Sequence, residues 1–172
     1  MLRIGLIGTG TVGGGVIAIL EQKIAEYKEK LGVELELSCI CAKSDEEVAP
    51  YKAKGYKTST NADEMIASKD IDVLVELAGG YNMPRKWILA ALENGKHVVT
   101  ANKALLAKYG HEIFPLAAKK GLHVLFEAAV GGGIPIIRSL QEGLLGSTVE
   151  SLSCIINGTC NYILSRMADE GL

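Results

Sequence analysis

Glycines follow the first apolar segment of the chain at a spacing that could hold a phosphate group. Residues 8–13 read Gly-Thr-Gly-Thr-Val-Gly, which matches G-x-G-x-x-G between a strand-like run and a helical pattern. The glycines of this motif permit a tight turn, approach of the backbone to a pyrophosphate, and packing of helix on sheet, in the order Gly8, Gly10 and Gly13. Thr11 and Val12, between Gly10 and Gly13, are also predicted to bind the cofactor, at the start of a helix whose N-terminus attracts anions. We predict a dinucleotide-binding turn, with a tight turn that binds nothing as the alternative.

The motif is followed by two further glycines, Gly14 and Gly15. Each costs a helix about 1 kcal/mol relative to alanine. We therefore expect them to pack closely against a neighbouring segment.

The end of the second apolar segment should distinguish NAD from NADP. Proteins that bind NAD usually carry an acid there, which hydrogen-bonds the ribose 2′-hydroxyl. Here Lys43 and Ser44 follow the segment, and Asp45 lies further into the loop. An ammonium group suits a 2′-phosphate, so the sequence favours NADP over NAD. The alternative is that Lys43 is a solvated loop residue.

Strand and helix patterns alternate along the chain. Apolar runs of strand length are found at 2–7, 34–41, 71–77, 97–100, 123–130 and 149–156. Helical spacing and capping signals predict helices at 12–30, 62–68, 84–94, 110–120, 135–145 and 159–170, whereas 45–60 is loop-like with at most a helical turn. This alternation predicts an α/β fold with a doubly wound parallel sheet, a Rossmann-type domain.

The chain is expected to hold one domain and the beginning of another. Residues 1–148 are assigned to the dinucleotide-binding domain, and residues 149–172 to the start of a second, truncated domain. The last helix carries an apolar stripe of Tyr162, Ile163 and Met167, yet the sequence stops at Leu172. We expect this stripe either to drive self-association or to leave the helix disordered.

Composition limits the classes of partner. The 172 residues are 48% apolar and 22% charged, with a net charge of −2. This balance predicts no nucleic-acid partner, and no apolar run reaches the roughly 18 residues of a membrane span. No signal peptide is recognised, which indicates a cytoplasmic protein. The chain has four cysteines, Cys39, Cys41, Cys154 and Cys160. Cys39 and Cys41 are two residues apart in an apolar segment, so on a strand they would share a face, and we expect buried, reduced thiols there rather than metal ligands or a disulfide.

Four segments resemble the homoserine dehydrogenase family in order and spacing. They are VELAGG (75–80), GKHVVTANKALLA (95–107), FEAAVGGGIPII (126–137) and NGTCNYIL (157–164). The resemblance covers essentially the whole chain. It implies hydride transfer with NAD or NADP between L-homoserine and L-aspartate 4-semialdehyde, in the biosynthesis of threonine, methionine and isoleucine. It also implies that the full-length protein is a homo-oligomer.

The resemblance implies roles for individual residues. Lys103 matches the lysine that lies between cofactor and substrate, where it would transfer a proton or polarise the hydroxyl. The alternative for Lys103 is a surface lysine in a loop. Glu76, Gly79 and Gly80 would line the adenosine side of the cofactor at the end of one strand, and Thr100 would lie near the nicotinamide at the end of the next. Gly158 and Thr159 match the start of the substrate domain and would contact the amino acid.

The glycine-rich segment after Phe126 resembles the family's monovalent-cation loop, in which one carboxylate and several backbone carbonyls bind sodium. Hard cations prefer such oxygen ligands. The resemblance implies ligation by Glu127 and by the carbonyls of Val130, Gly132 and Ile134. The alternative is a structural turn in which Glu127 caps a nearby helix.

The remaining catalytic residues of that family lie further along its chains than Leu172. We therefore expect this chain to bind a dinucleotide but to turn over substrate very slowly, because groups that position the substrate and move the proton would be absent. Two other functions stay open. One is another oxidoreductase of aspartate-family metabolism, such as a semialdehyde dehydrogenase with a nucleophilic cysteine or a dihydrodipicolinate reductase. The other is a non-catalytic dinucleotide-binding module.

Overall fold

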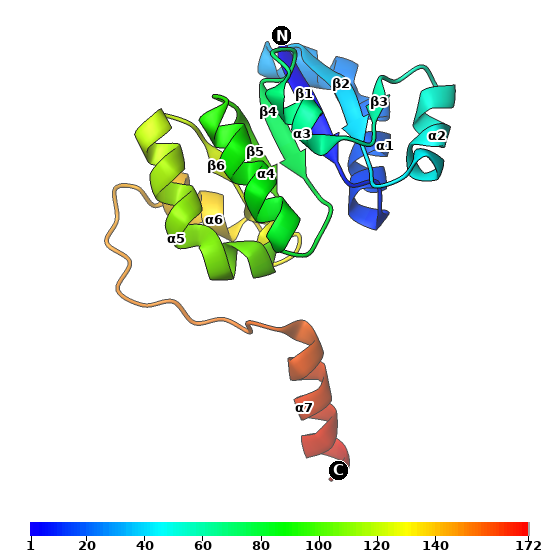
Figure 1. The fold of residues 1–172 in the computed structure, drawn as a ribbon. Helices are drawn as coiled ribbons and strands as arrows, with labels where there is room; N and C mark the ends of the chain where they lie inside the picture. The colour runs from blue at the N-terminus through cyan, green and yellow to red at the C-terminus, as the bar shows by residue number, and fades with distance from the viewer. Residues whose placement is uncertain (172) are drawn as a thin grey trace.

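The computed structural model describes residues 1–171, and its centre is a six-stranded sheet in which every pairing is parallel (Figure 1). The strand order is β3-β2-β1-β4-β5-β6. The strands are β1 (Leu2–Ile7), β2 (Leu35–Cys41), β3 (Thr58–Ser59), β4 (Val73–Glu76), β5 (His97–Thr100) and β6 (Val124–Leu125). Because the order runs outward in both directions from β1 and β4, the prediction of a doubly wound sheet is confirmed.

Helices cover both faces of this sheet. They are α1 (Thr11–Leu31), α2 (Asp45–Ala53), α3 (Ala62–Ala67), α4 (Asn82–Glu93) and α5 (Lys103–Lys120), followed by the short α6 (Ile136–Arg138) with a π-helical turn (Ser139–Gly143), and by α7 (Gly158–Glu170). Buried residues of α3, α4 and α5 form one core cluster with β1, β2, β4 and β5. Ile17 of α1 and Tyr51 of α2 contribute to a second cluster on the opposite face.

Strand β2 contains a bulge that decides which face its side chains meet. Ile4 of β1 pairs with Leu37, whereas the next residue, Gly5, pairs with Cys39, so one residue of β2 is left over. As a result Leu37 joins one core cluster and Cys39 the other, although two-residue spacing would place them on the same face. The sequence prediction that Cys39 and Cys41 share a face is confirmed.

The four cysteines divide into two kinds. Burial raises the pKa of the Cys39 thiol, and it raises the pKa of Cys41 to about 11, with the neighbouring Cys39 adding to the shift. Such thiols are poor nucleophiles, because the thiolate is the reactive form. Cys39 and Cys41 are buried, as predicted, whereas Cys154 and Cys160 are exposed.

Several segments differ from the elements predicted for them. The helix predicted at 110–120 begins earlier, at Lys103, because the Asn102 side chain caps it by accepting from the amide of Leu105. Residues 45–53 form the full helix α2, because Ser44 accepts a hydrogen bond from the amide of Glu47 and the first turn is acidic. The strand predicted at 123–130 is reduced to β6, since Glu127–Ala129 turn into a 3-10 helix. No strand forms at 149–156, where exposed residues lie beside no strand that could satisfy their backbone groups.

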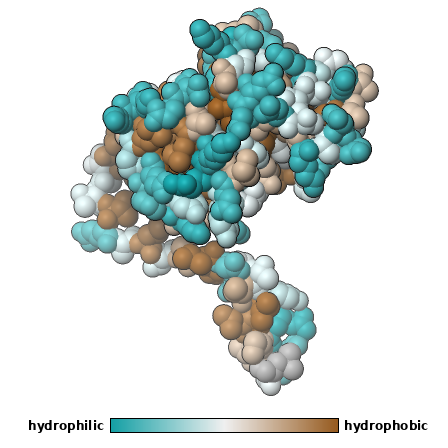
Figure 2. Space-filling model, in the orientation of Figure 1, coloured by the Kyte–Doolittle hydropathy of each residue, from teal (hydrophilic) through white to brown (hydrophobic). Residues whose placement is uncertain are grey.

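Helix α7 forms as predicted but lies apart from the sheet domain, at the end of an extended segment (Figure 1). Figure 2 shows apolar side chains gathered along this segment and on α7. They include Leu145, Leu152, Ile155, Ile156, Tyr162, Ile163, Leu164 and Met167, all exposed. Self-association through this surface stays a prediction. No helix within residues 1–171 has both the length and the apolarity to cross a bilayer.

A bidentate ion pair at the N-terminal edge of the sheet predicts how stability depends on pH. The Arg3 guanidinium donates to both carboxylate oxygens of Asp72, at 3.0 and 2.8 Å, and the Arg3 amide donates at 2.9 Å. These bonds lower the pKa of Asp72 from 3.8 to about 2. A carboxyl whose pKa is lower in the folded chain stabilises it above pH 4, and this contribution is lost as the pH falls toward 2.

Asp72→Asn is therefore expected to lower the urea midpoint of unfolding at pH 7. Between pH 4 and pH 2 the midpoint of this variant should decrease less than that of the wild type. Asp70→Asn is the matched control, because that carboxylate lies 3.6 Å from Arg3 with its side chain 72% exposed and should contribute little. Urea titrations at pH 7, 4 and 3 make the comparison. Equal midpoints for the two variants would contradict a stabilising role of Asp72.

Candidate functional site

The turn between β1 and α1 lies where the strand order reverses, and two of its glycines are required by geometry. Gly8 has a φ of 98°, and a Cβ there would lie 2.7 Å from the backbone of Leu77 and Ala78. A Cβ on Gly13 would lie 1.8 Å from the carbonyl oxygen of Gly8. No side chain fits at either position, so both glycines allow the turn to close.

Gly10 is free of such contacts and faces open space. It is the N-cap residue of α1 and supplies no side-chain cap, and residues 11–14 contain no acid. The first N–H groups of this 21-residue helix therefore carry partial positive charge. They lie beside Gly10, where a ligand can approach the backbone closely. The pyrophosphate of a dinucleotide fits this turn.

The glycines after the motif do not pack as predicted. A Cβ on Gly15 would have no heavy atom within 4 Å, and one on Gly14 would make only an ordinary contact with Tyr51 at 3.6 Å. The expectation of close packing is wrong at both positions. The physical reason is that the buried face of α1 runs through Gly13 and Ile17, which are one turn apart.

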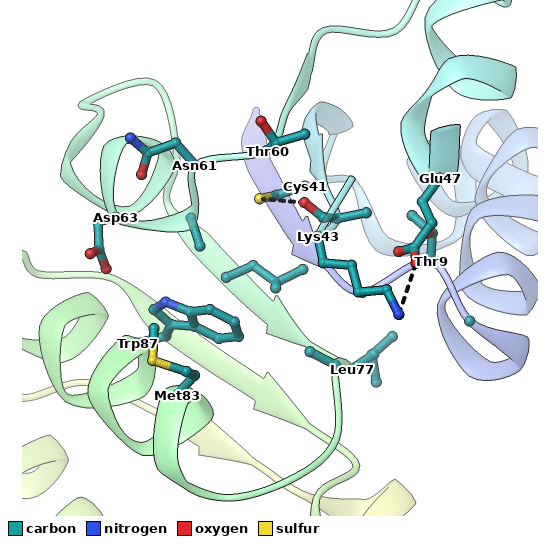
Figure 3. Close-up of a pocket in the computed structure, with 16 residues that line it drawn as sticks. Thr9, Cys41, Lys43, Glu47, Thr60, Asn61, Asp63, Leu77, Met83 and Trp87 are labelled. Carbon is teal, nitrogen blue, oxygen red and sulfur yellow. Dashed lines mark hydrogen bonds and ion pairs between the residues drawn. The ribbon is translucent and has the colours of Figure 1, made fainter. Parts of the chain in front are cut away.

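A cavity of about 720 Å³ opens beside Gly8 and Gly10 (Figure 3). Its other walls come from the end of β2, the residues around the start of α3, and helix α4. Side chains here that sequence reasoning did not single out are Thr60, Asn61, Asp63, Met83 and Trp87. Trp87, the only tryptophan of the chain, offers an apolar ring face of the kind on which a purine base can stack.

Lys43 lies in the wall of this cavity, as the cofactor prediction requires. Its Nζ lies 3.3 Å from Glu47 Oε1, and its side chain is 85% exposed (Figure 3). An ion pair this exposed is weak, so the ammonium can exchange Glu47 for a phosphate. Asp45, the acid nearest the strand end, borders a different hollow beside α2.

A second cavity, of about 920 Å³, lies on the other side of the turn and shares Leu77 with the first. Lys103, the first residue of α5, is exposed in its wall. The cavity brings together many of the residues predicted from the sequence: Val12, Gly79, Lys103, Val130, Gly132, Ile134, Gly158 and Thr159. Thr11 and Gly13 do not line either cavity; they belong to the first turn of α1.

Thr100 lies behind this cavity rather than in its wall. It is fully buried, and its hydroxyl donates to Glu76 Oε2 at 2.7 Å. Glu76 is also fully buried, and its Oε1 accepts a hydrogen bond from the Ala78 amide at 3.0 Å. Thr100 and Glu76 are therefore both buried, and Glu76 and Gly79 border the second cavity rather than the first. The predicted placement of Glu76 and Gly79 on the adenosine side does not fit the first cavity.

Glu127, the predicted carboxylate ligand of sodium, caps a helical turn. Its Oε1 accepts from the amide of Ile137 and its Oε2 from the amide of Arg138, both at 2.9 Å. This is the geometry of the structural alternative weighed for the segment. Within residues 1–171 no cluster of three or more His, Cys, Asp or Glu side chains could hold a metal ion, which leaves carbonyl ligation untested.

Comparisons with known proteins identify relatives along the whole chain. The homoserine dehydrogenase NAD-binding domain matches residues 8–127, and the family model named homoserine dehydrogenase matches residues 135–172. Homoserine dehydrogenase of Neisseria gonorrhoeae is 49% identical over 173 residues, and that of Pseudomonas aeruginosa is 45% identical over 175. Each alignment covers 99% of this chain and 39% of the relative.

Solved structures give the same answer. A homoserine dehydrogenase crystal structure from Thiobacillus denitrificans superposes with a TM-score of 0.89 at 45% identity, over 99% of this chain and 39% of that one. A hyperthermophilic archaeal homoserine dehydrogenase in complex with NADPH superposes with a TM-score of 0.68 at 26% identity, over 84% and 49%. This chain spans about 39% of the length of the curated relatives it matches, and it belongs to the homoserine dehydrogenase family.

Proposed function

We propose that this chain binds NADP, with NAD as the weaker ligand, through the two cavities on either side of the β1–α1 turn. The observation that carries the proposal is the open space at Gly10, beside an uncapped helix N-terminus and between two glycines that only fit as glycines. Lys43 is the proposed partner of the 2′-phosphate. The NADPH bound to the archaeal relative supports the same choice of cofactor.

The second cavity is the proposed place of the nicotinamide and of the substrate. When bound, the dinucleotide supplies the hydride acceptor for oxidation of an alcohol, or the donor for the reverse reaction. Lys103 is proposed to hold the hydroxyl of homoserine and to move its proton. Gly158 and Thr159 are proposed to contact the amino acid, since they line the same cavity. Gly79 lines the second cavity and not the first, so it is proposed to lie near the nicotinamide.

We further propose that residues 1–148 form the dinucleotide-binding domain and residues 149–172 the start of the substrate domain. The reaction of the whole family member interconverts homoserine and aspartate 4-semialdehyde, in a homo-oligomer. For this chain alone we propose tight cofactor binding and very slow turnover, because Lys103 would act without the other positioning groups of the family. A non-catalytic dinucleotide-binding module is the competing function, and measurable turnover would exclude it.

The test is a titration of the chain with NADP⁺ and with NAD⁺, followed by calorimetry. Because Trp87 is the only tryptophan and lines the first cavity, its fluorescence is expected to fall as either ligand binds. NADPH should also show sensitised emission when the indole is excited. Trp87→Phe should abolish both optical signals and leave the heat of binding. Heat of binding with no change in Trp87 fluorescence would place the ligand elsewhere.

Sodium binding by Glu127, Val130, Gly132 and Ile134 is proposed as a separate property of the segment after Phe126. It predicts that Na⁺, but not an equal concentration of the larger tetramethylammonium ion, raises the melting temperature of the wild type. Glu127→Gln should remove this difference, whereas Glu142→Gln, on the adjacent exposed turn, should keep it. A wild type that melts at the same temperature with both cations would leave Glu127 as a helix cap only.

A further inference from the structure

Glu76 carries a buried carboxylate that the proposed function does not use. The residue has no exposed surface at the end of β4. Within residues 1–171, no Lys, Arg or His forms an ion pair with it. Burying a carboxylate without a cation is costly unless hydrogen bonds replace its lost hydration. Its hydrogen-bond partners therefore indicate why a carboxylate stands at this position.

All the partners of Glu76 donate to it. Oε1 accepts from the Ala78 amide at 3.0 Å, and Oε2 accepts from the Thr100 hydroxyl at 2.7 Å and from Asn102 Nδ2 at 3.5 Å. Both oxygens of Glu76 therefore act as hydrogen-bond acceptors. Ala78 lies in the loop after β4, and Thr100 and Asn102 lie at the end of β5 and just beyond it. One side chain thus joins the loops that leave two neighbouring strands.

Asn102 extends this connection to the start of helix α5. Its Nδ2 donates to the Gly80 carbonyl at 2.6 Å, and its Oδ1 accepts from the Leu105 amide at 3.2 Å, which caps the helix. Its own amide donates to the Thr100 hydroxyl at 3.1 Å. Lys103 directly follows Asn102, so the position of its backbone is set by this network. The same loops supply Gly79, Ala101 and Lys103 to the wall of the second cavity.

We propose that Glu76 is a positioning residue for the nicotinamide half of the site, which holds the 77–80 loop and the start of α5 together through Thr100 and Asn102. This inference rests on the proposed binding of NADP. It assigns to Glu76 no contact with the first cavity, where the adenosine half would lie, because Glu76 lines only the second. Both acceptor oxygens of Glu76 are needed for this connection.

A glutamine at this position separates these requirements from simple packing. Glu76→Gln keeps the size of the side chain but offers one acceptor oxygen and one NH2 group. If the oxygen keeps Ala78, the NH2 group can donate to the Thr100 hydroxyl, but it cannot accept from Asn102. The connection to Asn102, and through it to Lys103, is then the one that is lost.

The experiment compares two ligands that differ only in the nicotinamide. NADP⁺ and 2′-phospho-ADP-ribose are titrated by calorimetry into the wild-type chain and into Glu76→Gln, after circular dichroism has verified that each is folded. We expect Glu76→Gln to weaken NADP⁺ by about tenfold, the effect of one lost hydrogen bond, and to change 2′-phospho-ADP-ribose by less than about twofold. Lys43→Ala is the control with the opposite pattern, since it should weaken both ligands alike.

Thr100→Val provides a second variant of matched shape, which removes one donor to Glu76 and the acceptor of the Asn102 amide. It should show the same selective loss and decides the question if Glu76→Gln does not fold. Equal weakening of both ligands in Thr100→Val and Glu76→Gln, or no change in either, would overturn the proposal. So would equal affinity of the wild type for the two ligands, because no nicotinamide contact would then exist to position. A wild type that binds neither ligand would instead refute the proposed function.

Discussion

Gly13→Ala is expected to abolish measurable dinucleotide binding and to lower the stability of the chain. The new Cβ would lie 1.8 Å from the carbonyl oxygen of Gly8, so the turn must move by more than 1 Å to relieve the overlap. Overpacking of this kind typically costs about 1–3 kcal/mol. The same movement takes the first N–H groups of α1 away from a bound pyrophosphate. Losing two charge-assisted hydrogen bonds to the pyrophosphate would weaken the affinity by roughly 100-fold or more.

The matched control lies two residues further along the same helix. At Gly15 a Cβ would meet nothing within 4 Å, and replacing a helical glycine by alanine favours the helix by about 1 kcal/mol. Gly15→Ala is therefore expected to raise the melting temperature and to keep NADP⁺ binding. Calorimetry and thermal melts of both variants make the comparison. If Gly13→Ala bound NADP⁺ as tightly as Gly15→Ala, the turn would not be the phosphate site.

Lys43→Ala is expected to weaken NADP⁺ by roughly 10- to 100-fold and NAD⁺ by less than about twofold, because only NADP⁺ carries the 2′-phosphate that the ammonium would bind. Because the Lys43 side chain is exposed, the substitution should have little effect on the stability of the fold. Glu47→Gln should act in the opposite direction. It removes the carboxylate that pairs with Lys43 at 3.3 Å and would repel the phosphate.

Lys52→Ala controls for the change in net charge, since Lys52 lies in the last turn of α2 and outside the first cavity. Competitive titrations with both cofactors, repeated at two salt concentrations, measure the selectivity of each variant. If NADP⁺ were attracted only by the overall charge of the protein, Lys43→Ala and Lys52→Ala would weaken NADP⁺ binding equally. This effect would disappear at high salt. Loss of NADP⁺ and NAD⁺ by the same factor in Lys43→Ala would exclude Lys43 as the group that reads the 2′-phosphate.

Local signals in the sequence were sufficient for much of the fold. The run from β1 through the glycines to α1 was recognised because strand periodicity, glycine spacing and helical periodicity follow one another within 30 residues, and each depends on near neighbours. Asn61 caps α3 through the amide three positions away. Asn102 carries the same local signal for α5, but the prediction of a helix from residue 110 did not use it. Where a prediction needed a distant partner it failed, as for the strand at 149–156, whose neighbours along the chain provide no paired edge.

The candidate site also has features that local sequence sets and features that depend on distant contacts. The sequence by itself determined the glycine-rich turn between a strand and a helix, the placement of Lys43 and Lys103 after strands, and the family, because motif residues are adjacent in the chain. Only the tertiary structure decided that Trp87 joins Lys43 in one cavity, that Gly15 faces open space, and that Glu127 caps a helix. It alone placed Glu76 beside Thr100, 24 residues away in sequence. The physical reason is that parallel strands bring distant chain segments to one edge of the sheet, and no periodicity within a segment encodes which side chains meet there.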